Sequence, residues 1–180
     1  RPGRAVSARV GGMIQMNSDY AASLLHARHK GQASAFTGFQ NDTRKMHGGE
    51  LYIAIRGAQV DGHDFIQQAY AKGATVALVE KESNCSITQI ICDDCIKAMG
   101  ALAAHWREQF SSVLIAITGS NGKTTVKEMV AAILSIDGPV LMTQGNLNNH
   151  IGVPLTLARL SGQHHAAIVE MGANHKGEIA

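Results

Sequence analysis

The segment that most constrains the fold of this chain spans residues 113–134, VLIAITGSNGKTTVKEMVAAIL. Residues 113–118 are apolar or β-branched, which predicts a strand buried on both faces of a parallel sheet. A glycine-rich turn follows, and from about Lys123 the apolar residues recur at helical spacing. Strand, glycine turn and helix in this order predict a phosphate-binding loop, because the backbone N–H groups and the dipole at a helix N-terminus favour an anion.

Consecutive residues of this turn are the candidate ATP-binding set. Lys123 supplies a mobile positive charge for the phosphates, and the hydroxyl of Thr124 is placed to bind a magnesium ion that bridges them. The general phosphate-loop pattern has its first glycine further upstream, where Ile117 stands here, so this loop is a shorter form. The alternative is an ordinary strand-to-helix turn with a surface lysine, and the flanking strand and helix argue against it. The set comprises Gly119, Ser120, Asn121, Gly122, Lys123, Thr124 and Thr125.

A second site residue comes from the strand predicted over residues 166–171. Glu170 lies near the C-terminal end of this apolar stretch, and a lone carboxylate at that place beside a phosphate loop is expected to bind magnesium. The alternative is a salt bridge at the end of the strand. We assign Lys123 and Glu170 to catalysis, and Thr124 together with Glu170 to the metal.

The composition is that of a globular protein with little charge imbalance. Of 180 residues, 45% are hydrophobic, and the formal net charge is +2. Three arginines lie in residues 1–12, which we expect to be a disordered leader, so the rest of the chain is slightly acidic and no nucleic-acid partner is expected. No apolar run reaches the roughly 18 residues of a membrane helix, and no signal-peptide core follows the basic start. We expect a cytoplasmic protein without membrane insertion that acts as a monomer.

Strands and helices alternate upstream of the phosphate loop, which predicts an α/β fold with a parallel sheet. The polar link at 110–112 is the expected boundary between a small N-terminal substrate-binding domain, 13–109, and the first part of a parallel-sheet phosphate-loop ATPase domain, 110–180. Strands are expected at 51–55, 75–79, 89–92 and 140–142, and helices at 64–72 and 96–109. The apolar residues expected on one side of the last helix are Met99, Leu102, Ala103 and Trp106.

Two polar clusters of the first domain lie in loops, where α/β sheets bind ligands. The NDTR segment ends at Arg44, whose planar fork of donors suits a phosphate or a carboxylate. The GAQVDGHDF segment carries Asp61, His63 and Asp64 between a strand and a helix. Asp and Gly also favour plain loops, and Asp61 or Asp64 can cap a helix, so binding and turn chemistry stay equally open on spacing alone.

An asparagine-rich loop follows the strand at 140–142. It contains Asn146, Asn148 and Asn149, whose amides offer donors and acceptors without charge. Such a loop can recognise a polar ligand or merely turn the chain, and the spacing does not decide between these two roles.

Three cysteines, Cys85, Cys92 and Cys95, include one C-x-x-C pair. A zinc site needs a second pair of ligands nearby, and a redox site usually lies at the start of a helix after a strand, a condition that is loosely met here. Asp93 and Asp94 between the two cysteines are expected to raise the pKa of the thiols. We therefore interpret the cysteines as structural and assign them no role.

With these segments assembled, residues 13–180 resemble the Mur ligases, the ATP-dependent amide-bond-forming enzymes of bacterial peptidoglycan synthesis. The segments that carry the resemblance are DTR, GELYIA leading to DGHDF, TGSNGKTTVKEM, GNLNNHIGVPLTL and VEMGANHKGEI. The shorter phosphate loop is the form that this family uses. The GNLNN and GANHKGE segments are most similar to the branch of the family that joins D-alanyl-D-alanine to UDP-N-acetylmuramoyl-tripeptide.

The resemblance implies a role for each cluster, with ATP and Mg²⁺ as cofactors. Thr43, Arg44, Asp61 and His63 match the segments that hold the UDP-muramoyl substrate, and this match favours binding where spacing left the choice open. The phosphate loop matches the ATP site, and Glu170 matches the magnesium-binding glutamate of the family. Further residues that match segments near the substrate and the γ-phosphate are Asn146, Asn149 and His175.

The implied function is an ATP-dependent ligase of the bacterial cytoplasm that joins D-alanyl-D-alanine to UDP-N-acetylmuramoyl-tripeptide through an acyl phosphate. The family has three domains, and this chain is expected to end inside the second and to be inactive alone. One alternative is a fragment that binds nucleotide or UDP-sugar without turnover. The other is a different phosphate-loop enzyme, such as a kinase, a sister Mur ligase or a folylpolyglutamate synthase. The DTR and DGH segments of the first domain argue against these alternatives.

Overall fold

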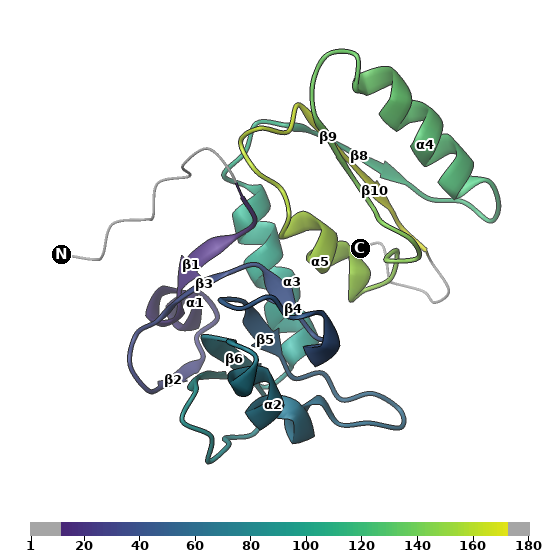
Figure 1. Cartoon of the computed structure of the whole chain (residues 1–180). Helices are drawn as coiled ribbons and strands as arrows, with labels where there is room; N and C mark the ends of the chain where they lie inside the picture. Colours follow the sequence, from purple (N-terminus) through teal and green to yellow (C-terminus); the bar gives the residue numbers. More distant parts are fainter. Residues whose placement is uncertain (1–11, 173–180) are drawn as a thin grey trace. The chain divides into compact units, whose positions relative to one another are not determined.

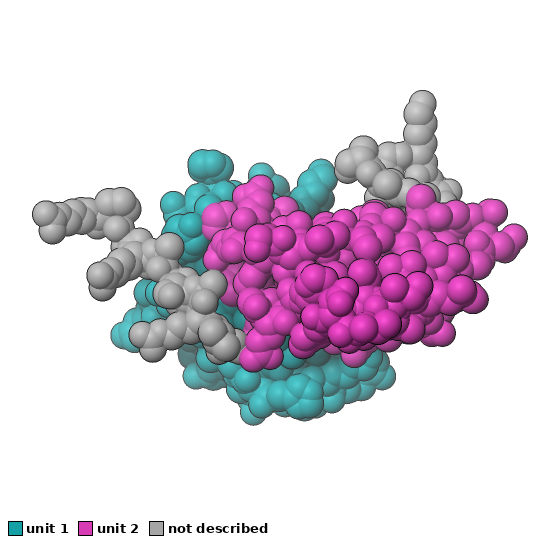
Figure 2. All heavy atoms as spheres, turned by 90° about the horizontal axis from the view of Figure 1, so that it is seen from above, with its two compact units in different colours: residues 1–7, 13–102 teal, residues 8–12, 103–180 magenta. Residues whose placement is uncertain are grey.

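The computed structural model describes residues 12–172, which fold into two compact units (Figure 2). The first unit is Met13–Leu102 and the second begins at Ala103, so the division falls inside helix α3, Cys95–Arg107. The link at 110–112, where we expect the domain boundary, lies a few residues further along the chain. The assignment of a substrate domain and an ATPase domain stays a prediction.

The core of the first unit is a five-stranded sheet (Figure 1). Its strands are β2 Arg28–Lys30, β4 Phe39–Gln40, β5 Leu51–Ile53, β6 Val76–Val79 and β7 Thr88–Ile91. Their order in the sheet is β2-β7-β6-β5-β4, and all neighbours pair in parallel except β2, which is antiparallel to β7. The parallel α/β prediction is therefore confirmed. Every residue of β5 and β6 is buried, as is typical of central strands covered on both faces.

Short helices and a two-stranded ribbon complete the first unit. The ribbon pairs β1, Gln15–Asn17, with β3, Ala35–Thr37, in antiparallel fashion. The helices are α1 Ser18–Leu24, α2 Ile66–Ala71 and the 3₁₀-helices η1 Thr43–Lys45 and η2 Gly62–Phe65. Sequence analysis did not predict the ribbon or the edge strand β2, because each of these strands is three residues long and too short to show a period.

The long helix predicted over residues 96–109 is α3. Its side chains predicted to face inward are all buried, namely Met99, Leu102, Ala103 and Trp106. Asp94 precedes the helix, and its Oδ1 accepts the backbone N–H groups of Ile96 and Lys97, both at 2.9 Å. In the second unit the indole N–H of Trp106 donates to the carbonyl oxygen of Leu160 at 2.8 Å, which satisfies its buried donor.

The second unit is built on a three-stranded parallel sheet. Its strands are β8 Val113–Ile117, β9 Val140–Met142 and β10 Ala166–Glu170, in the order β8-β10-β9. Helices α4, Lys123–Leu134, and α5, Gly152–Leu157, both contact β10 (Figure 1). Ile117 pairs with Glu170 in the register, so the carboxyl ends of β8 and β10 meet at one edge of the sheet.

Strand β8 is not buried on both faces, and the prediction for residues 113–118 is wrong in this respect. Val113 and Leu114 are 57% and 37% exposed, because β8 has only one strand beside it in the described sheet. The central place belongs to β10, whose residues are all buried. Helix α4 turns Lys127 and Ala131 inward, whereas much of its apolar face is exposed, including Val126, Met129 and Ile133.

Within residues 12–172, no helix has both the length and the apolar character needed to cross a membrane. Residues 1–11 of the expected leader lie outside the part of the chain that the structure describes, as do residues 173–180, which include His175. The expectations for these two segments stay predictions.

Gly62 offers a test of the packing in the first unit. An alanine Cβ at this position would lie 2.7 Å from both the backbone nitrogen and the oxygen of Ile55, and this backbone cannot move aside as a flexible side chain can. We expect Gly62→Ala to lower the free energy of unfolding by about 1–3 kcal/mol. The measurement is urea denaturation followed by circular dichroism.

Gly100 provides the matched control, because it lies within α3 and an alanine Cβ there would have no atom within 4 Å. Gly100→Ala is expected to stabilise the protein by about 0.5–1 kcal/mol, since alanine is the better helix former. Equal effects of the two substitutions would contradict the close approach of Gly62 to Ile55.

Candidate active site

The phosphate loop of the second unit joins the end of β8 to the first turn of α4. Gly122 caps the helix with φ 75°, a left-handed conformation that favours glycine. The ammonium group of Lys123 donates a hydrogen bond to the carbonyl oxygen of Gly119 at 2.7 Å, so its charge is held at the loop. The residues predicted to bind ATP thus form one continuous turn at a helix N-terminus, where an anion is favoured.

The side chain of Glu170 is the centre of a buried polar cluster at the carboxyl end of β10. Its Oε2 accepts a hydrogen bond from the hydroxyl of Thr124 at 3.1 Å and lies 3.5 Å from the ammonium group of Lys127. Its Oε1 accepts from the side-chain amide of Asn148 at 2.9 Å. The side chains of Glu170 and Lys127 are only 4% and 3% exposed, so both charges have been withdrawn from water.

The pKa of Glu170 reflects two opposing effects. Burial by itself would raise the pKa, because it disfavours the charged carboxylate. Hydrogen bonds from Asn148 and Thr124, together with the charge of Lys127, outweigh burial and lower the pKa below its usual value. Glu170 is therefore held as a carboxylate, the form that can bind a metal ion.

Two members of this cluster, Lys127 and Asn148, were missed by sequence analysis. Lys127 follows Thr124 by three positions, a spacing that puts both side chains on the same face of α4, and this spacing is the signal that could have identified it. Asn148 belongs to the asparagine-rich loop, but nothing in its local sequence separates it from Asn146 and Asn149. Of the two alternatives for Glu170, the ion pair is present, with Lys127 as the partner, and the metal-binding role stays a prediction.

Thr124 and Glu170 are suited to hold magnesium. Their oxygen atoms lie 3.1 Å apart at the helix N-terminus, and a hydroxyl with a carboxylate is a donor set that this ion prefers. Among residues 12–172 there is no group of three or more His, Cys, Asp or Glu side chains that could hold a metal. A magnesium ion held here would need further ligands, which the phosphate oxygens of a nucleotide and water could supply.

The asparagine-rich loop contacts Glu170 through Asn148, whereas Asn149 forms hydrogen bonds within the chain. The side-chain oxygen of Asn149 accepts the backbone N–H groups of Ile151 and Gly152 at 3.1 and 2.8 Å, which fixes the start of α5. Asn146 is exposed. The backbone N–H of Glu170 donates to the hydroxyl of the buried Thr143 at 2.9 Å, so β9 also positions the carboxylate. The ligand contacts predicted for Asn146 and Asn149 stay predictions.

In the first unit, the NDTR segment leads into η1, and its arginine is paired with its own aspartate. Arg44 donates to both carboxylate oxygens of Asp42, at 2.9 and 2.8 Å, and the arginine side chain is 85% exposed. Hydrogen bonding from Arg44 lowers the pKa of Asp42 to about 2. The guanidinium group is thus aligned by Asp42 while it remains open to solvent, as a residue that binds phosphate must be.

Thr43 connects this segment to helix α2. Its hydroxyl donates to Oε1 of Gln68 at 2.6 Å, and its carbonyl oxygen accepts from the ammonium group of Lys72 at 2.8 Å. Thr43 itself is 6% exposed. Gln68 and Lys72 were not singled out by sequence analysis, because their positions on α2 carry no motif. These contacts join the NDTR segment to the helix that follows the DGHDF segment.

Hydrogen bonds between Asp61 and His63 hold the DGHDF segment in its turn. Asp61 accepts the backbone N–H of His63 at 3.0 Å, lies 2.6 Å from His63 Nδ1 and pairs with Arg56 at 3.2 Å. Hydrogen bonds from His63, first from its backbone and then from its ring, lower the pKa of Asp61 to about 2. His63 Nε2 accepts the backbone N–H of Glu80 at 2.9 Å, which places the ring proton on Nδ1. Both ring nitrogens are therefore engaged within the fold.

Tyr52 lies beneath these two loops and was also missed. It is 1% exposed, and its hydroxyl donates to the carbonyl oxygen of Gly62 at 2.9 Å. Burial, with added repulsion from Asp42 and Asp61, raises the pKa of Tyr52 to about 12. The hydrogen bond of this phenol to Gly62 joins β5 to the DGHDF loop.

Comparison with known proteins identifies the family to which this geometry belongs. A model of the Mur ligase family catalytic domain matches residues 35–133, and a model of the Mur ligase middle domain matches residues 117–180. The chain is 45% identical over 168 residues to the UDP-N-acetylmuramoyl-tripeptide--D-alanyl-D-alanine ligase of Escherichia coli strain K12. That alignment covers 93% of this chain and 37% of the relative, so the chain spans little more than a third of the relative's length.

Solved structures lead to the same family. MurF from Acinetobacter baumannii superimposes with a TM-score of 0.87 at 36% identity, over 94% of this chain and 38% of that one. MurF from Thermotoga maritima in complex with ADP gives a TM-score of 0.72 at 30% identity, over 79% and 33% of the two chains. The catalytic-domain match alone covers more than half of the sequence and includes the NDTR segment, the DGHDF segment and the phosphate loop. The chain therefore belongs to the Mur ligase family.

Proposed function

We propose that this protein is an ATP-dependent ligase that joins D-alanyl-D-alanine to UDP-N-acetylmuramoyl-tripeptide in peptidoglycan synthesis. The observation that carries the proposal is the buried cluster in which Glu170 contacts Thr124 of the phosphate loop and Asn148 of the asparagine-rich loop. This cluster joins the general nucleotide-binding segment to the segment most similar to the D-alanyl-D-alanine-adding branch. The name of the Escherichia coli relative supports the same substrates, and the ADP complex of the Thermotoga maritima structure supports ATP.

The first unit is proposed to bind the UDP-muramoyl part of the substrate. The exposed Arg44, aligned by Asp42, is suited to bind the diphosphate. The hydroxyl of the buried Thr43 donates to Gln68, so its contacts support a role in positioning Arg44, and the binding role predicted for Thr43 stays a prediction. The binding role predicted for Asp61 and His63 stays a prediction. Because their polar atoms are engaged with each other, with Arg56 and with Glu80, their contacts support a role in shaping the loop that receives the substrate.

The chemistry of the second unit follows from charge. The tripeptide carboxylate must approach the γ-phosphate of ATP, which means that one anion approaches another. The ammonium group of Lys123 can leave the carbonyl oxygen of Gly119 and bind phosphate oxygens instead. The backbone N–H groups at the start of α4 add further positive potential. Magnesium, when bound at Thr124 and Glu170, neutralises charge on the phosphates. Lys127 keeps Glu170 ionised and in place from within the protein.

The reaction then proceeds in two transfers. A carboxylate oxygen of the tripeptide bonds to the γ-phosphorus as the bond to the ADP oxygen breaks, which gives an acyl phosphate and ADP. The free amine of D-alanyl-D-alanine attacks the acyl carbon, loses a proton and expels inorganic phosphate. Water must be excluded, since it would hydrolyse the acyl phosphate. We propose that the protein works in the cytoplasm as a monomer, where ATP is present.

Replacing Lys123 tests the phosphate loop. Lys123→Ala in the full-length protein is expected to weaken ATP binding by about 10- to 100-fold, the value of a charge-assisted hydrogen bond. Binding of UDP-N-acetylmuramoyl-tripeptide is expected to be unchanged, because Thr43 and Arg44 belong to the other unit. Titration calorimetry with each ligand measures both, and the exposed Lys97→Ala variant is the control. Unchanged turnover of Lys123→Ala would contradict the assignment.

Replacing Glu170 separates metal binding from a purely structural role. Glu170→Gln keeps the shape but removes the charge, so turnover is expected to fall by about 10²–10³-fold and to be partly restored by excess magnesium. The unpaired charge of Lys127 is expected to reduce stability by about 3–5 kcal/mol as well. Rate, magnesium dependence and melting temperature are measured together. A variant that melts earlier but keeps the wild-type rate would show that Glu170 is structural only.

The 180-residue chain by itself is expected to make no amide bond. It spans 37% of the Escherichia coli relative, and the apolar side chains of Val126, Met129 and Ile133 on α4 are exposed in the described structure. Closure around the reactants contributes on the order of 7–11 kcal/mol in such reactions, and a partly open site forfeits it. The assay supplies ATP, magnesium, UDP-N-acetylmuramoyl-tripeptide and D-alanyl-D-alanine, with mass spectrometry for the pentapeptide product. Turnover near that of the intact Escherichia coli enzyme would contradict this prediction.

A further inference from the structure

The two cysteines of the C-x-x-C segment lie together in the first unit, at the carboxyl end of its sheet. Cys92 directly follows β7, and Cys95 is the first residue of α3. Both are free thiols, and their sulfur atoms lie 3.8 Å apart. The thiol of Cys95 donates to the carbonyl oxygen of Leu78 at 3.4 Å, while Cys92 Sγ lies 3.7 Å from that of Val79. A strand, a C-x-x-C turn and a helix in this order form the local setting of dithiol redox sites.

The two thiols differ in access to solvent. Cys95 is fully buried, whereas Cys92 is partly exposed. An incoming reagent can therefore reach Cys92 but not Cys95. Cys85, the remaining cysteine, is also partly exposed, and it packs against the apolar cluster around Tyr52 and Ile66. Cys85 therefore serves as the comparison in the same chain, a partly exposed thiol outside the Cys92–Cys95 pair.

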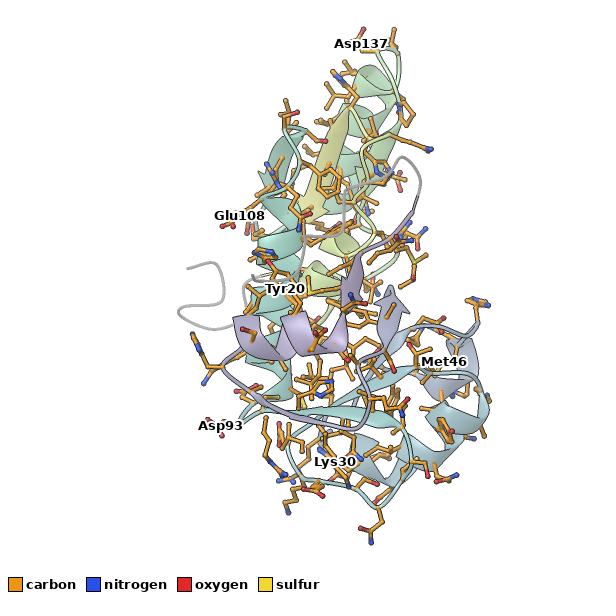
Figure 3. The ribbon with its side chains drawn as sticks, turned by 90° about the vertical axis from the view of Figure 1, so that its left-hand side faces the viewer. Tyr20, Lys30, Met46, Asp93, Glu108 and Asp137 are labelled. Atoms are coloured by element: carbon orange, nitrogen blue, oxygen red, sulfur yellow. The ribbon has the colours of Figure 1, made fainter. Side chains whose placement is uncertain are left out.

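The two thiols also differ in acidity. Hydrogen bonding with Cys95 lowers the pKa of Cys92, and the backbone N–H of Asp94 adds to this effect, against burial and the nearby carboxylates of Glu80 and Asp94. The same pairing, together with burial, raises the pKa of Cys95. The charge of Asp94 does act to raise the pKa of both thiols, as expected from the sequence, but for Cys92 the hydrogen bond with Cys95 outweighs it and the net pKa is lowered. Asp93 is exposed and points away from the ribbon at the start of α3 (Figure 3), so water screens its charge.

We propose that Cys92 and Cys95 form a redox-active dithiol, which a low-molecular-weight disulfide converts to a reversible Cys92–Cys95 disulfide. The thiolate of Cys92 attacks one sulfur of the reagent, breaks its S–S bond and releases one half as a thiolate. The thiol of Cys95 gives its proton to that released thiolate, and its sulfur then attacks Sγ of Cys92 and expels the second half. The two cysteines lose two electrons and two protons, and the reagent is reduced to two thiols.

Neighbouring contacts connect this pair to a loop of the proposed substrate site. The backbone N–H of Cys95 donates to Oε1 of Glu80 at 3.3 Å, and the backbone N–H of Glu80 donates to Nε2 of His63 at 2.9 Å. Glu80 thus anchors both the start of α3 and the DGHDF segment. Formation of the disulfide requires the sulfur atoms to approach from 3.8 Å to bonding distance, so the residues around Glu80 are the first to adjust.

The experiment treats the native 180-residue chain with glutathione disulfide and follows intact mass and alkylation of the remaining thiols. The wild-type chain is expected to lose the mass of two hydrogen atoms, to keep only Cys85 open to alkylation and to recover fully in dithiothreitol. Cys92 is expected to react about tenfold faster than Cys85, because the neighbouring thiol of Cys95 favours the thiolate of Cys92 and then resolves the adduct. Cys85→Ser, the matched control, is expected to form the same disulfide.

Variants of the pair distinguish this chemistry from simple packing of two thiols. Cys95→Ser is expected to stop at a stable glutathione adduct on Cys92, since no second thiol resolves it. Cys95→Ala provides the same test if serine disturbs the buried site, with circular dichroism as the check of folding. Cys92→Ser is expected to form no disulfide. A wild-type chain that keeps a glutathione adduct, that pairs Cys85 instead, or that reacts only after unfolding in denaturant would overturn the proposal.

Discussion

The buried ion pair between Lys127 and Glu170 is the interaction on which the second unit depends. Both side chains are almost completely removed from water, and such a pair is stable only when further hydrogen bonds offset the loss of hydration. Thr124 and Asn148 supply those hydrogen bonds from two different segments. The requirement to satisfy one carboxylate therefore fixes the first turn of α4, the end of β10 and the asparagine-rich loop relative to one another. The proposed catalytic geometry follows from this electrostatic constraint.

Parallel pairing explains why polar residues gather at one edge of each sheet. In the second unit the register of β8 and β10 brings Ile117 beside Glu170, so the phosphate loop starts where the carboxylate ends. In the first unit Glu80 and Cys92 lie just beyond the carboxyl ends of β6 and β7. The DGHDF loop, which is proposed to help bind the substrate, and the cysteine pair share this edge because parallel strands deliver their following loops to the same side.

Hydrogen bonds within the first unit separate polar residues that shape its loops from polar residues that stay open to a ligand. The spacing of Asp61 and His63 left ligand binding and turn chemistry equally open, and only the family resemblance favoured binding. In the structure their polar atoms close the loop and anchor it to Glu80. Arg44 is different, since Asp42 aligns it while its side chain stays exposed. A polar residue in a binding loop can therefore shape the loop or contact the ligand, and only its hydrogen-bond partners separate these roles.

The sequence by itself determined the class of fold, the positions of strands β5 to β10, helix α3 with its buried face and the phosphate loop, because these features depend on local periodicity and glycine placement. It also identified Thr124 and Glu170 as candidate magnesium ligands, because a hydroxyl and a carboxylate beside a phosphate loop suit that ion. Only the tertiary structure decided that β10 rather than β8 is central, that Lys127 and Asn148 complete the cluster around Glu170, and that Cys92 and Cys95 are paired with opposite shifts in pKa. These properties depend on contacts between residues distant in the chain and on the burial that results, and neither is encoded in the spacing of any single segment.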